Sequence, residues 1–470
     1  MLRGRNDTDG CIASSGRVVH LALLQWETRE PMVLSVAAGL MSVFFLAGLY
    51  VAAALGLIGV FLMYFFSDRP LWDMLGQIAW NVNSSFVLVA VPLFIMMGEI
   101  LVRSGISERM YRTLSHWLGP LPGGLLHSNI AACAIFAAVS GSSAATAATI
   151  GSVSMPAFQA RGYSERLVAG TLAAGGTLGI LIPPSILFII YGVLVEESIG
   201  RLYMAGFIPG FILALVFMLI ITIIALISPA SAPREPAPAL RVRLIGLLAM
   251  IPMFFLMFIV LGTIYLGIAT PTEAAAFGVV AGLMLAAVER QLNYQMLKDV
   301  MLATVRSSCM IMLIVTGAFI MSFALAILGV PAQVTQWVAG MQLTPVRLVI
   351  FLVIFYIILG TFMESLSMMV TTIPIILPAL KAAGVDLVWF GVIMVILVEA
   401  ALISPPEGIN LYVIQGIRKT VQADAGLEAG TMMDLWIGVL PFMLGMAIVI
   451  VLLMVFPDLA LWLPTLMKGR

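Results

Sequence analysis

The chain has 470 residues, of which 62% are hydrophobic and 10% are charged, and its 23 basic residues balance its 23 acidic ones. A mean hydropathy of +1.13 excludes a soluble globular protein, and zero net charge gives no indication of nucleic-acid binding. Apolar stretches of about 20 residues, long enough to cross a bilayer as a helix, recur along the chain. We therefore expect an all-α polytopic membrane protein.

The polar N-terminal segment, residues 1–30, differs from the apolar chain that follows it. It lacks the basic and then apolar profile of a signal peptide, and we interpret it as a disordered extension or as the product of a start codon assigned upstream of the true one. The next apolar run, 31–66, is too long for one crossing, and we expect it to break near Gly48. Further spans are predicted at 85–103, 165–192, 202–227, 243–266, 271–289, 303–329, 388–417 and 434–456.

Prolines, glycines and hydroxyl residues form a pattern that occurs twice, with residue numbers that differ by 222 throughout. The first copy contains Ser143, Thr149, Pro156, Gly162 and Pro183-Pro184, and the second contains Ser365, Thr371, Pro378, Gly384 and Pro405-Pro406. Glycine and proline inside an apolar stretch weaken or interrupt a helix. Paired helix interruptions in two halves of a membrane protein indicate the substrate site of a secondary transporter.

Two stretches crowded with small and hydroxyl residues, about 125–156 and 346–378, are each either one crossing or a re-entrant hairpin. With hairpins, each half contains five crossings, so the second half is inserted upside down relative to the first. This organisation predicts a first inverted repeat over 31–227, a linker over 228–242 and a second inverted repeat over 243–470. Lysines and arginines are concentrated in the loops on the side of the linker, which places the linker in the cytoplasm.

In the first half, the predicted hairpin tip Ser140-Gly141-Ser142-Ser143 faces the broken helix 165–192. A chain that turns at such a tip directs carbonyl and hydroxyl oxygens at one point, and its half-helix N-termini attract carboxylates. Neutral oxygens of this kind suit a hard monovalent cation such as sodium. The alternative is that the small residues only let helices pack closely. The tandem prolines of the facing helix favour the binding site, because close packing does not require them.

The second half has a related tip over residues 360–365 and a broken helix over 388–417, and it is richer in acid. Glu364, Glu399 and Glu407 lie in apolar surroundings, where ionisable residues are rare and usually functional. We expect them to bind a cation or to carry a proton; the alternative is a position near the membrane interface, where water solvates the carboxylate.

Other chemistry has little support in the sequence. It contains neither a phosphate-binding loop nor a histidine pair at metal-ligand spacing, which disfavours an ATP-driven motor and a metal centre. An intramembrane protease would need a lysine or histidine at membrane depth beside its serine, and we find none. We therefore expect no enzyme activity and no cofactor.

Four motifs in matching order resemble the large membrane subunit of TRAP transporters (tripartite ATP-independent periplasmic transporters). They are the tip at 140–146, the break at 179–185, the segment 269–274 and the segment 403–411. The resemblance covers the chain from about Met32 to the C-terminus. It implies an ion-transporter-superfamily fold with a scaffold and an elevator-type transport domain. It also implies sodium-driven import of small organic acids across the bacterial inner membrane, with a small four-helix membrane subunit and a periplasmic binding protein as partners.

The resemblance further implies which residues bind ions and substrate. The sodium ligands would come from Ser140, Gly141, Ser142, Ser143, Thr177, Gly179 and Pro183 in the first half, and from Gly360, Thr361, Met363, Glu364, Ser404, Pro405 and Glu407 in the second. Ser185, Asn410 and Ser365 would face the substrate. The alternative function is a stand-alone sodium- or proton-coupled transporter of carboxylates or other anions with the same fold, and an intramembrane enzyme is a distant third.

Overall fold

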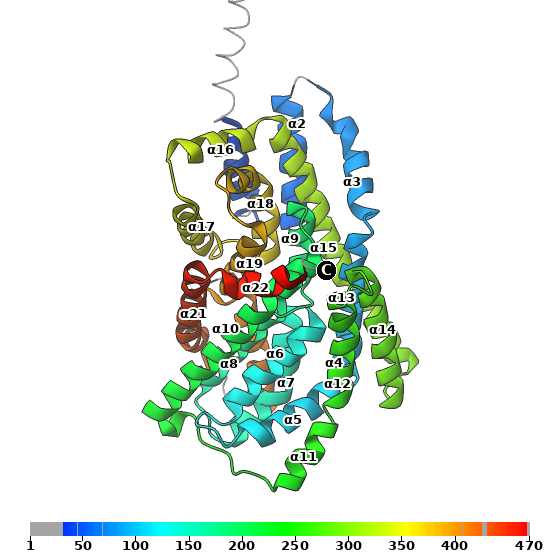
Figure 1. Ribbon diagram of the computed structural model, residues 1–470, viewed down its shortest axis with the longest axis vertical. Helices are drawn as coiled ribbons and strands as arrows, with labels where there is room; N and C mark the ends of the chain where they lie inside the picture. Colours follow the sequence, from blue (N-terminus) through cyan, green and yellow to red (C-terminus); the bar gives the residue numbers. More distant parts are fainter. Residues whose placement is uncertain (1–31, 45, 68, 407, 425–429, 468–470) are drawn as a thin grey trace, which may run out of the picture.

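A computed structural model describes residues 32–44, 46–67, 69–406, 408–424 and 430–467 (Figure 1). The predicted N-terminal extension, 1–30, lies outside the described residues. Within them every regular element is a helix, which confirms the all-α fold. Because helices satisfy their own backbone hydrogen bonds, this is the expected form for an apolar chain in a bilayer.

The helices of the N-terminal half run up to the linker. They are Met32–Phe44, α2 (Val51–Phe66), α3 (Leu75–Asn83), α4 (Ala90–Arg103), α5 (Ile106–Leu118), α6 (Leu125–Ser140), α7 (Ser143–Ala160), α8 (Glu165–Thr177), α9 (Ile186–Val195) and α10 (Ile199–Ile227). The helices after the linker are α11 (Leu240–Leu248), α12 (Ile251–Met257), α13 (Thr263–Tyr265), α14 (Pro271–Val288), α15 (Tyr294–Ile327), α16 (Val330–Gly340), α17 (Pro345–Leu359), α18 (Ser365–Ala382), α19 (Leu387–Ile403), α20 (Ile409–Asp424), α21 (Met432–Val455) and α22 (Asp458–Met467).

The long apolar run at 31–66 is interrupted where the sequence predicts. One helix ends at Phe44 and α2 begins at Val51. Between them, Gly48 has a φ of +71°, a left-handed conformation that glycine adopts without strain. The predicted break near Gly48 is therefore confirmed.

Fewer single helices are long enough to cross a bilayer than the sequence predicts. Among the described residues, five helices meet that length and composition, namely α10, α14, α15, α18 and α21, and seven spans result if two bent helix pairs are each counted as one. Two of the predicted spans are broken helices, as the sequence predicts. The predicted spans 165–192 and 388–417 each consist of two shorter helices, α8 with α9 and α19 with α20, separated by non-helical residues.

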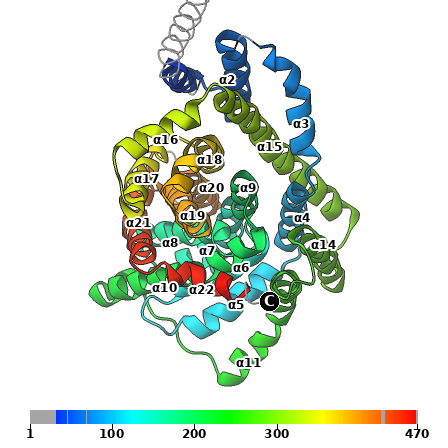
Figure 2. The same ribbon diagram turned by 45° about the horizontal axis from the view of Figure 1, so that its top comes forward.

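The helices form two groups, which Figures 1 and 2 show beside each other. The outer group consists of α2, α3, α4, α14 and α15, which pack on one another. The inner group consists of α6–α10 and α19–α22, with close packing of α8 on α21 and of α7 on α20. Helix α18 contacts α15 of the outer group as well as α9 and α19 of the inner group.

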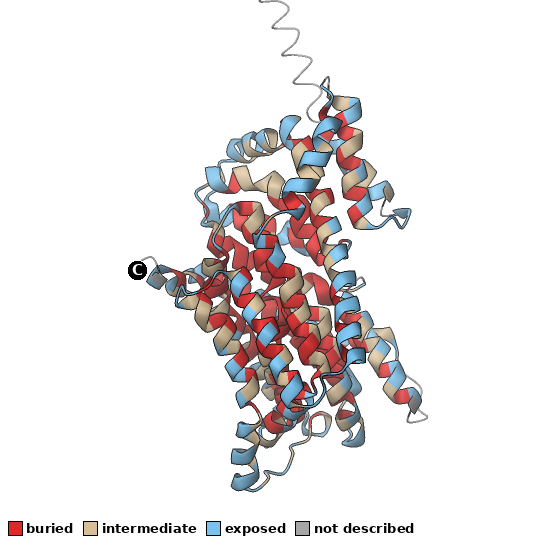
Figure 3. Ribbon diagram, turned by 90° about the vertical axis from the view of Figure 1, so that its right-hand side faces the viewer, coloured by how far each residue is buried: buried red, intermediate tan, exposed pale blue. Residues whose placement is uncertain are grey.

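Helix α19 of the inner group is buried along nearly its whole length. Apart from Glu399, its residues are apolar on all sides, which is the pattern of a helix surrounded by other helices. Figure 3 shows buried residues along the centre of the molecule and exposed residues on its outer helices. Exposed side chains on α15 include Met310 and Leu313, as expected for a surface that meets lipid.

The predicted linker, 228–242, begins at the end of α10 and ends inside α11. Tyr163, in the loop between α7 and α8, donates from its hydroxyl to Pro233 O at 2.7 Å, and Glu235 N donates to Gly119 O at 3.0 Å. Burial raises the pKa of Tyr163 to about 12, so the hydroxyl remains a donor at neutral pH. The linker is thus attached to the end of α5 and, through Tyr163, to the loop between α7 and α8.

Helices α8 and α21 cross at two glycines. A Cβ atom at Gly170 would overlap the carbonyl oxygen of Gly438, and a Cβ atom at Gly438 would overlap the carbonyl oxygen of Arg166. Only glycine on both helices permits this backbone contact, which is the small-residue packing that brings membrane helices together.

We expect Gly170→Ala to push α8 and α21 apart and to lower the free energy of unfolding by about 1–3 kcal/mol, the usual cost of overpacking. The matched control is Gly416→Ala on α20, where an added Cβ atom meets no atom within 4 Å. Thermal unfolding of both purified variants in the same detergent checks the prediction. Equal midpoints for the two variants would show that the crossing tolerates a methyl group.

Candidate functional site

The first tip is a tight turn between α6 and α7. Gly141 follows α6 with a φ of +59°, and Ser142 then caps α7 by accepting a hydrogen bond from Ala145 N at 3.4 Å. Thr146 Oγ1 donates to Ser142 O and lies 2.8 Å from Ser140 Oγ. The turn therefore gathers hydroxyl and carbonyl oxygens between the end of one helix and the start of the next, as the sequence predicts.

The first tip contacts the break between α8 and α9 through backbone atoms. A Cβ atom at Gly179 would lie 2.7 Å from Ser142 O, and a Cβ atom at Gly141 would lie 3.0 Å from Pro184 O. Neither position can accept a larger residue without moving the facing chain. The predicted residues of tip and break in the first half thus lie together.

Asn410, the second residue of α20, joins the second break to the first tip. It is fully buried, and its Nδ2 donates to Ser143 Oγ at 3.1 Å and to Ala173 O at 3.2 Å. Ser143 Oγ in turn donates to Gly176 O at 2.9 Å. Among the described residues, Asn410 Oδ1 has no hydrogen-bond partner, so one acceptor remains for a ligand.

The second tip lies between α17 and α18. Glu364 caps α18: its carboxylate accepts hydrogen bonds from Leu366 N at 3.1 Å, from Ser367 N at 3.0 Å and from Ser367 Oγ at 2.9 Å. A Cβ atom at Gly360 would lie 2.7 Å from Ala401 Cβ, so this tip contacts the C-terminal end of α19. The sequence shows Glu364 as an acid in apolar surroundings, and the structure gives it three donors.

Each tip and the break that it faces form a half-site, and the two half-sites repeat the same contacts at positions 222 residues apart. Ser143 Oγ donates to Gly176 O, and 222 residues later Ser365 Oγ donates to Val398 O at 3.4 Å. The helix caps Ser142 and Glu364 also differ by 222. The peptide bonds Pro183-Pro184 and Pro405-Pro406 are both cis. The two halves thus differ at the cap, which is a neutral hydroxyl in the first and a carboxylate in the second.

The remaining predicted residues occupy these tips and breaks with local partners. Thr177 Oγ1 donates to Ala174 O at 2.7 Å, and Thr361 Oγ1 donates to Ile358 O at 2.7 Å. Ser185 is fully buried, caps α9 and donates to Ile180 O. Met363 is buried at the second tip, and Ser404 is buried at the second break. Pro405 lies among the non-helical residues of the second break, and Pro183 lies at the equivalent position of the first break. Glu407 lies outside the described residues.

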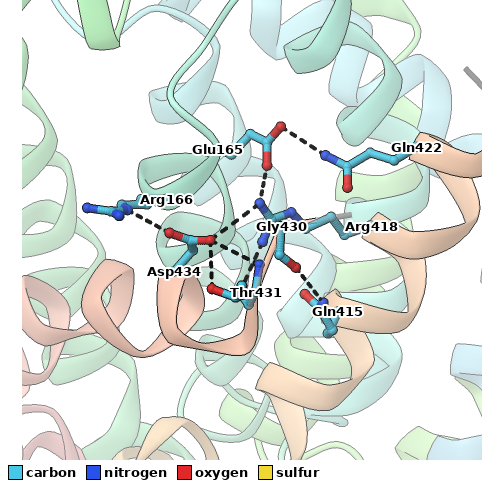
Figure 4. Close-up of polar contacts among 8 residues, drawn as sticks. All are labelled: Glu165, Arg166, Gln415, Arg418, Gln422, Gly430, Thr431 and Asp434. Carbon is cyan, nitrogen blue, oxygen red and sulfur yellow. Dashed lines mark hydrogen bonds and ion pairs between the residues drawn. The ribbon is translucent and has the colours of Figure 1, made fainter. Parts of the chain in front are cut away.

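A cluster of charged and amide side chains holds α20 against α8 and α21 (Figure 4). Arg418 is 3% exposed and forms an ion pair with Glu165, whose other oxygen accepts from Gln422 Nε2 at 2.9 Å. Asp434 pairs with Arg166 at 2.7 Å, and Gln415 Nε2 donates to Gly430 O at 2.9 Å. The sequence does not predict this cluster, because Glu165 and Arg418 are 253 residues apart. It holds the helix that carries Asn410.

Comparison with known proteins identifies what the chain is similar to. The family model described as "Tripartite ATP-independent periplasmic transporter, DctM component" matches residues 38–459. The C4-dicarboxylate TRAP transporter large permease protein DctM of Rhodobacter capsulatus is 33% identical, over 91% of this chain and 98% of that protein. The protein of the same name from Pseudomonas aeruginosa is 31% identical, over 87% of this chain and 93% of its own length.

A third relative is longer than the region it shares with this chain. The isethionate TRAP transporter permease protein DctMQ of Oleidesulfovibrio alaskensis is 35% identical over 82% of this chain, which spans 60% of that protein. Among solved structures, the YdaH transporter of Alcanivorax borkumensis superposes with a TM-score of 0.63, over 89% of this chain and 97% of that one. At 15% identity this likeness concerns the fold.

The paired serine contacts predict unequal costs for the same substitution. Ser143→Ala removes a 2.9 Å hydrogen bond and one of the two acceptors of Asn410 Nδ2, so we expect a loss of about 1–3 kcal/mol of stability. Ser365→Ala removes one 3.4 Å hydrogen bond, and we expect a loss of about 0.5–1 kcal/mol. Thermal unfolding in one detergent compares the two variants. A larger loss for Ser365→Ala would contradict the hydrogen-bond assignment.

Proposed function

The chain belongs to the family of DctM components of tripartite ATP-independent periplasmic transporters, and on this basis we propose that it is the large membrane subunit of a sodium-coupled importer of small organic acids. Relatives in this family are named as permeases, which move a substrate without transforming it, so the chain is not an enzyme. The membrane is the bacterial inner membrane, which the chain crosses several times.

The observation that carries sodium coupling is the set of neutral oxygens at the first tip. Ser142 O, Thr146 Oγ1 and Ser140 Oγ lie within hydrogen-bond distance of one another, and Gly179 closes on the same carbonyl. Carbonyls and hydroxyls at unwound membrane helices are the ligands that sodium takes in transporters of this kind. At the second tip, Gly360, Thr361, Met363, Glu364, Ser404, Pro405 and Glu407 would supply the equivalent site.

The substrate class follows from the helix N-termini and from the relatives. The N-termini of α9 and α20 begin directly after the two breaks, and such half-helix ends attract carboxylates. Ser185, Ser365 and the unpartnered Oδ1 of Asn410 would orient the substrate. Relatives are named for C4-dicarboxylates, isethionate and sialic acid, all of which are organic acids. We therefore expect a small organic anion.

An elevator-type movement would carry the first tip and the two breaks across the membrane as one body. The breaks and the first tip lie in the inner group, where Asn410 joins α20 to Ser143 of α7 and the Arg418 ion pair joins α20 to α8. The outer group would remain fixed as the scaffold. The description "tripartite" supports two partners, which we propose are a small four-helix membrane subunit and a periplasmic binding protein.

Reconstitution tests this proposal. The chain, its small membrane subunit and its binding protein are placed in liposomes, and uptake of radiolabelled succinate and N-acetylneuraminate is followed. We expect uptake with an inward sodium gradient and background uptake when potassium replaces sodium. Uptake indifferent to sodium would sink sodium coupling, and sodium-dependent uptake without the partners would instead establish the stand-alone transporter.

Ser142→Ala removes the hydroxyl that caps α7 at the predicted sodium site, and we expect the sodium concentration for half-maximal uptake to rise about tenfold, equivalent to about 1.4 kcal/mol. Ser152→Ala on the same helix is the control, because among the described residues Ser152 Oγ bonds only within its own helix, to Thr149 O. An unchanged sodium dependence in Ser142→Ala would remove the Ser142 hydroxyl from the site, since the Ser142 carbonyl oxygen is present in both proteins.

A further inference from the structure

Glu399 is a carboxylic acid without a partner in the centre of the inner group. It lies on α19, its side chain is fully buried, and among the described residues neither of its oxygens has a hydrogen-bond partner. The contrast with Glu364 is direct, because the carboxylate of Glu364 accepts three hydrogen bonds at the start of α18. One half-site thus contains two glutamates in opposite environments.

The helices packed on α19 are α8, α9, α10, α17, α18, α20, α21 and α22. Charged side chains occur on most of these helices and at their caps. Those with ion-pair partners of their own are Glu165, Arg166, Arg201, Arg418 and Asp434. The others are Arg347, Lys381, Lys419 and Asp458, together with the caps Glu364 and Asp386. Within the described residues, none of them forms an ion pair or a hydrogen bond with Glu399.

The tyrosines on the same helices are hydrogen-bonded elsewhere. Tyr191 donates to Leu387 O, Tyr203 to Ser185 O and Tyr412 to Pro406 O, while the hydroxyl of Tyr356 pairs with Thr372 Oγ1. Consequently no described hydroxyl donates to Glu399. An ionised carboxylate buried without a cation or a donor costs several kcal/mol, whereas the neutral acid avoids most of that cost. In this arrangement the carboxyl group therefore holds a proton.

Glu399 is also next to the parts of the second half-site that must move if the site opens. The carbonyl of the preceding residue, Val398, accepts the hydrogen bond from Ser365 of the second tip, and Ala401 contacts Gly360. The second break begins at Ser404. The position 222 residues earlier is Thr177, so the first half has a neutral hydroxyl where the second half has an acid. Acids at membrane depth are usually functional.

We propose that Glu399 is a proton-binding site of the transport cycle. In the closed arrangement its O–H bond is intact. When the second tip and the second break separate and water enters, that bond breaks, the proton passes to water and the carboxylate remains; closing reverses the step. The role of Glu399 in a transport cycle rests on the proposed function, whereas its protonation in the closed arrangement does not.

Infrared spectroscopy of the purified full-length chain at neutral pH detects a protonated carboxyl group directly. We expect a carbonyl band from a protonated carboxyl group that is lost in Glu399→Gln and kept in Glu364→Gln. If Glu399→Gln does not give a monodisperse protein, Glu399→Thr replaces it, because threonine is the residue at the equivalent position of the first half, Thr177. A wild-type spectrum without such a band, or a band that persists in the Glu399 variants, overturns the proposal.

Proteoliposomes loaded with a pH-sensitive dye test the exchange of the proton. We expect uptake of the same labelled acids to move protons in the wild type, and the number of protons moved per molecule of labelled acid to fall in Glu399→Gln. Proton movement unchanged in Glu399→Gln would overturn the role in the cycle. A wild type that binds the proton by infrared but shows no sodium-dependent uptake would count against the proposed function and not against the proton site.

Discussion

Backbone groups released at helix breaks inside a membrane must find partners within the protein, because lipid supplies none. The structure meets this requirement with side-chain hydroxyls and with contacts between breaks. Ser143 Oγ donates to Gly176 O, Ser365 Oγ donates to Val398 O, and Thr146 Oγ1 donates to Ser142 O. The same groups that satisfy the breaks also form the candidate ion site, so the stability of the inner group and its binding chemistry rest on one set of hydrogen bonds.

Close backbone contact is the second device that holds the half-sites together. Glycines at 141, 179 and 360 let each tip approach the facing chain, and Gly170 and Gly438 let α8 and α21 cross. The contacts at Gly141, Gly179, Gly170 and Gly438 lie within the inner group and leave little room for rearrangement there, which suits movement as one body. The Arg418 ion pair adds a polar connection at one end of that body.

The two halves use the same contacts with different charge. The first half places neutral Ser142 and Thr177 where the second places Glu364 and Glu399. Only the environment separates the two acids: Glu364 has three donors at a helix start, and Glu399 has none in a helix interior. A repeat that duplicates backbone geometry can therefore place acids in one half at positions where the other half has neutral hydroxyls.

The sequence by itself determined the all-α class, the break at Gly48, the tips and the two double-proline breaks, because glycine, proline and serine act on the backbone next to them. Tertiary structure alone decided which groups meet. Asn410 and Ser143 are 267 residues apart, and Glu165 and Arg418 are 253 apart. It also decided that Glu364 caps α18 and that Glu399 lacks a partner. Local pattern cannot distinguish two acids in apolar stretches, because the energy of a buried charge depends on neighbours brought by other helices.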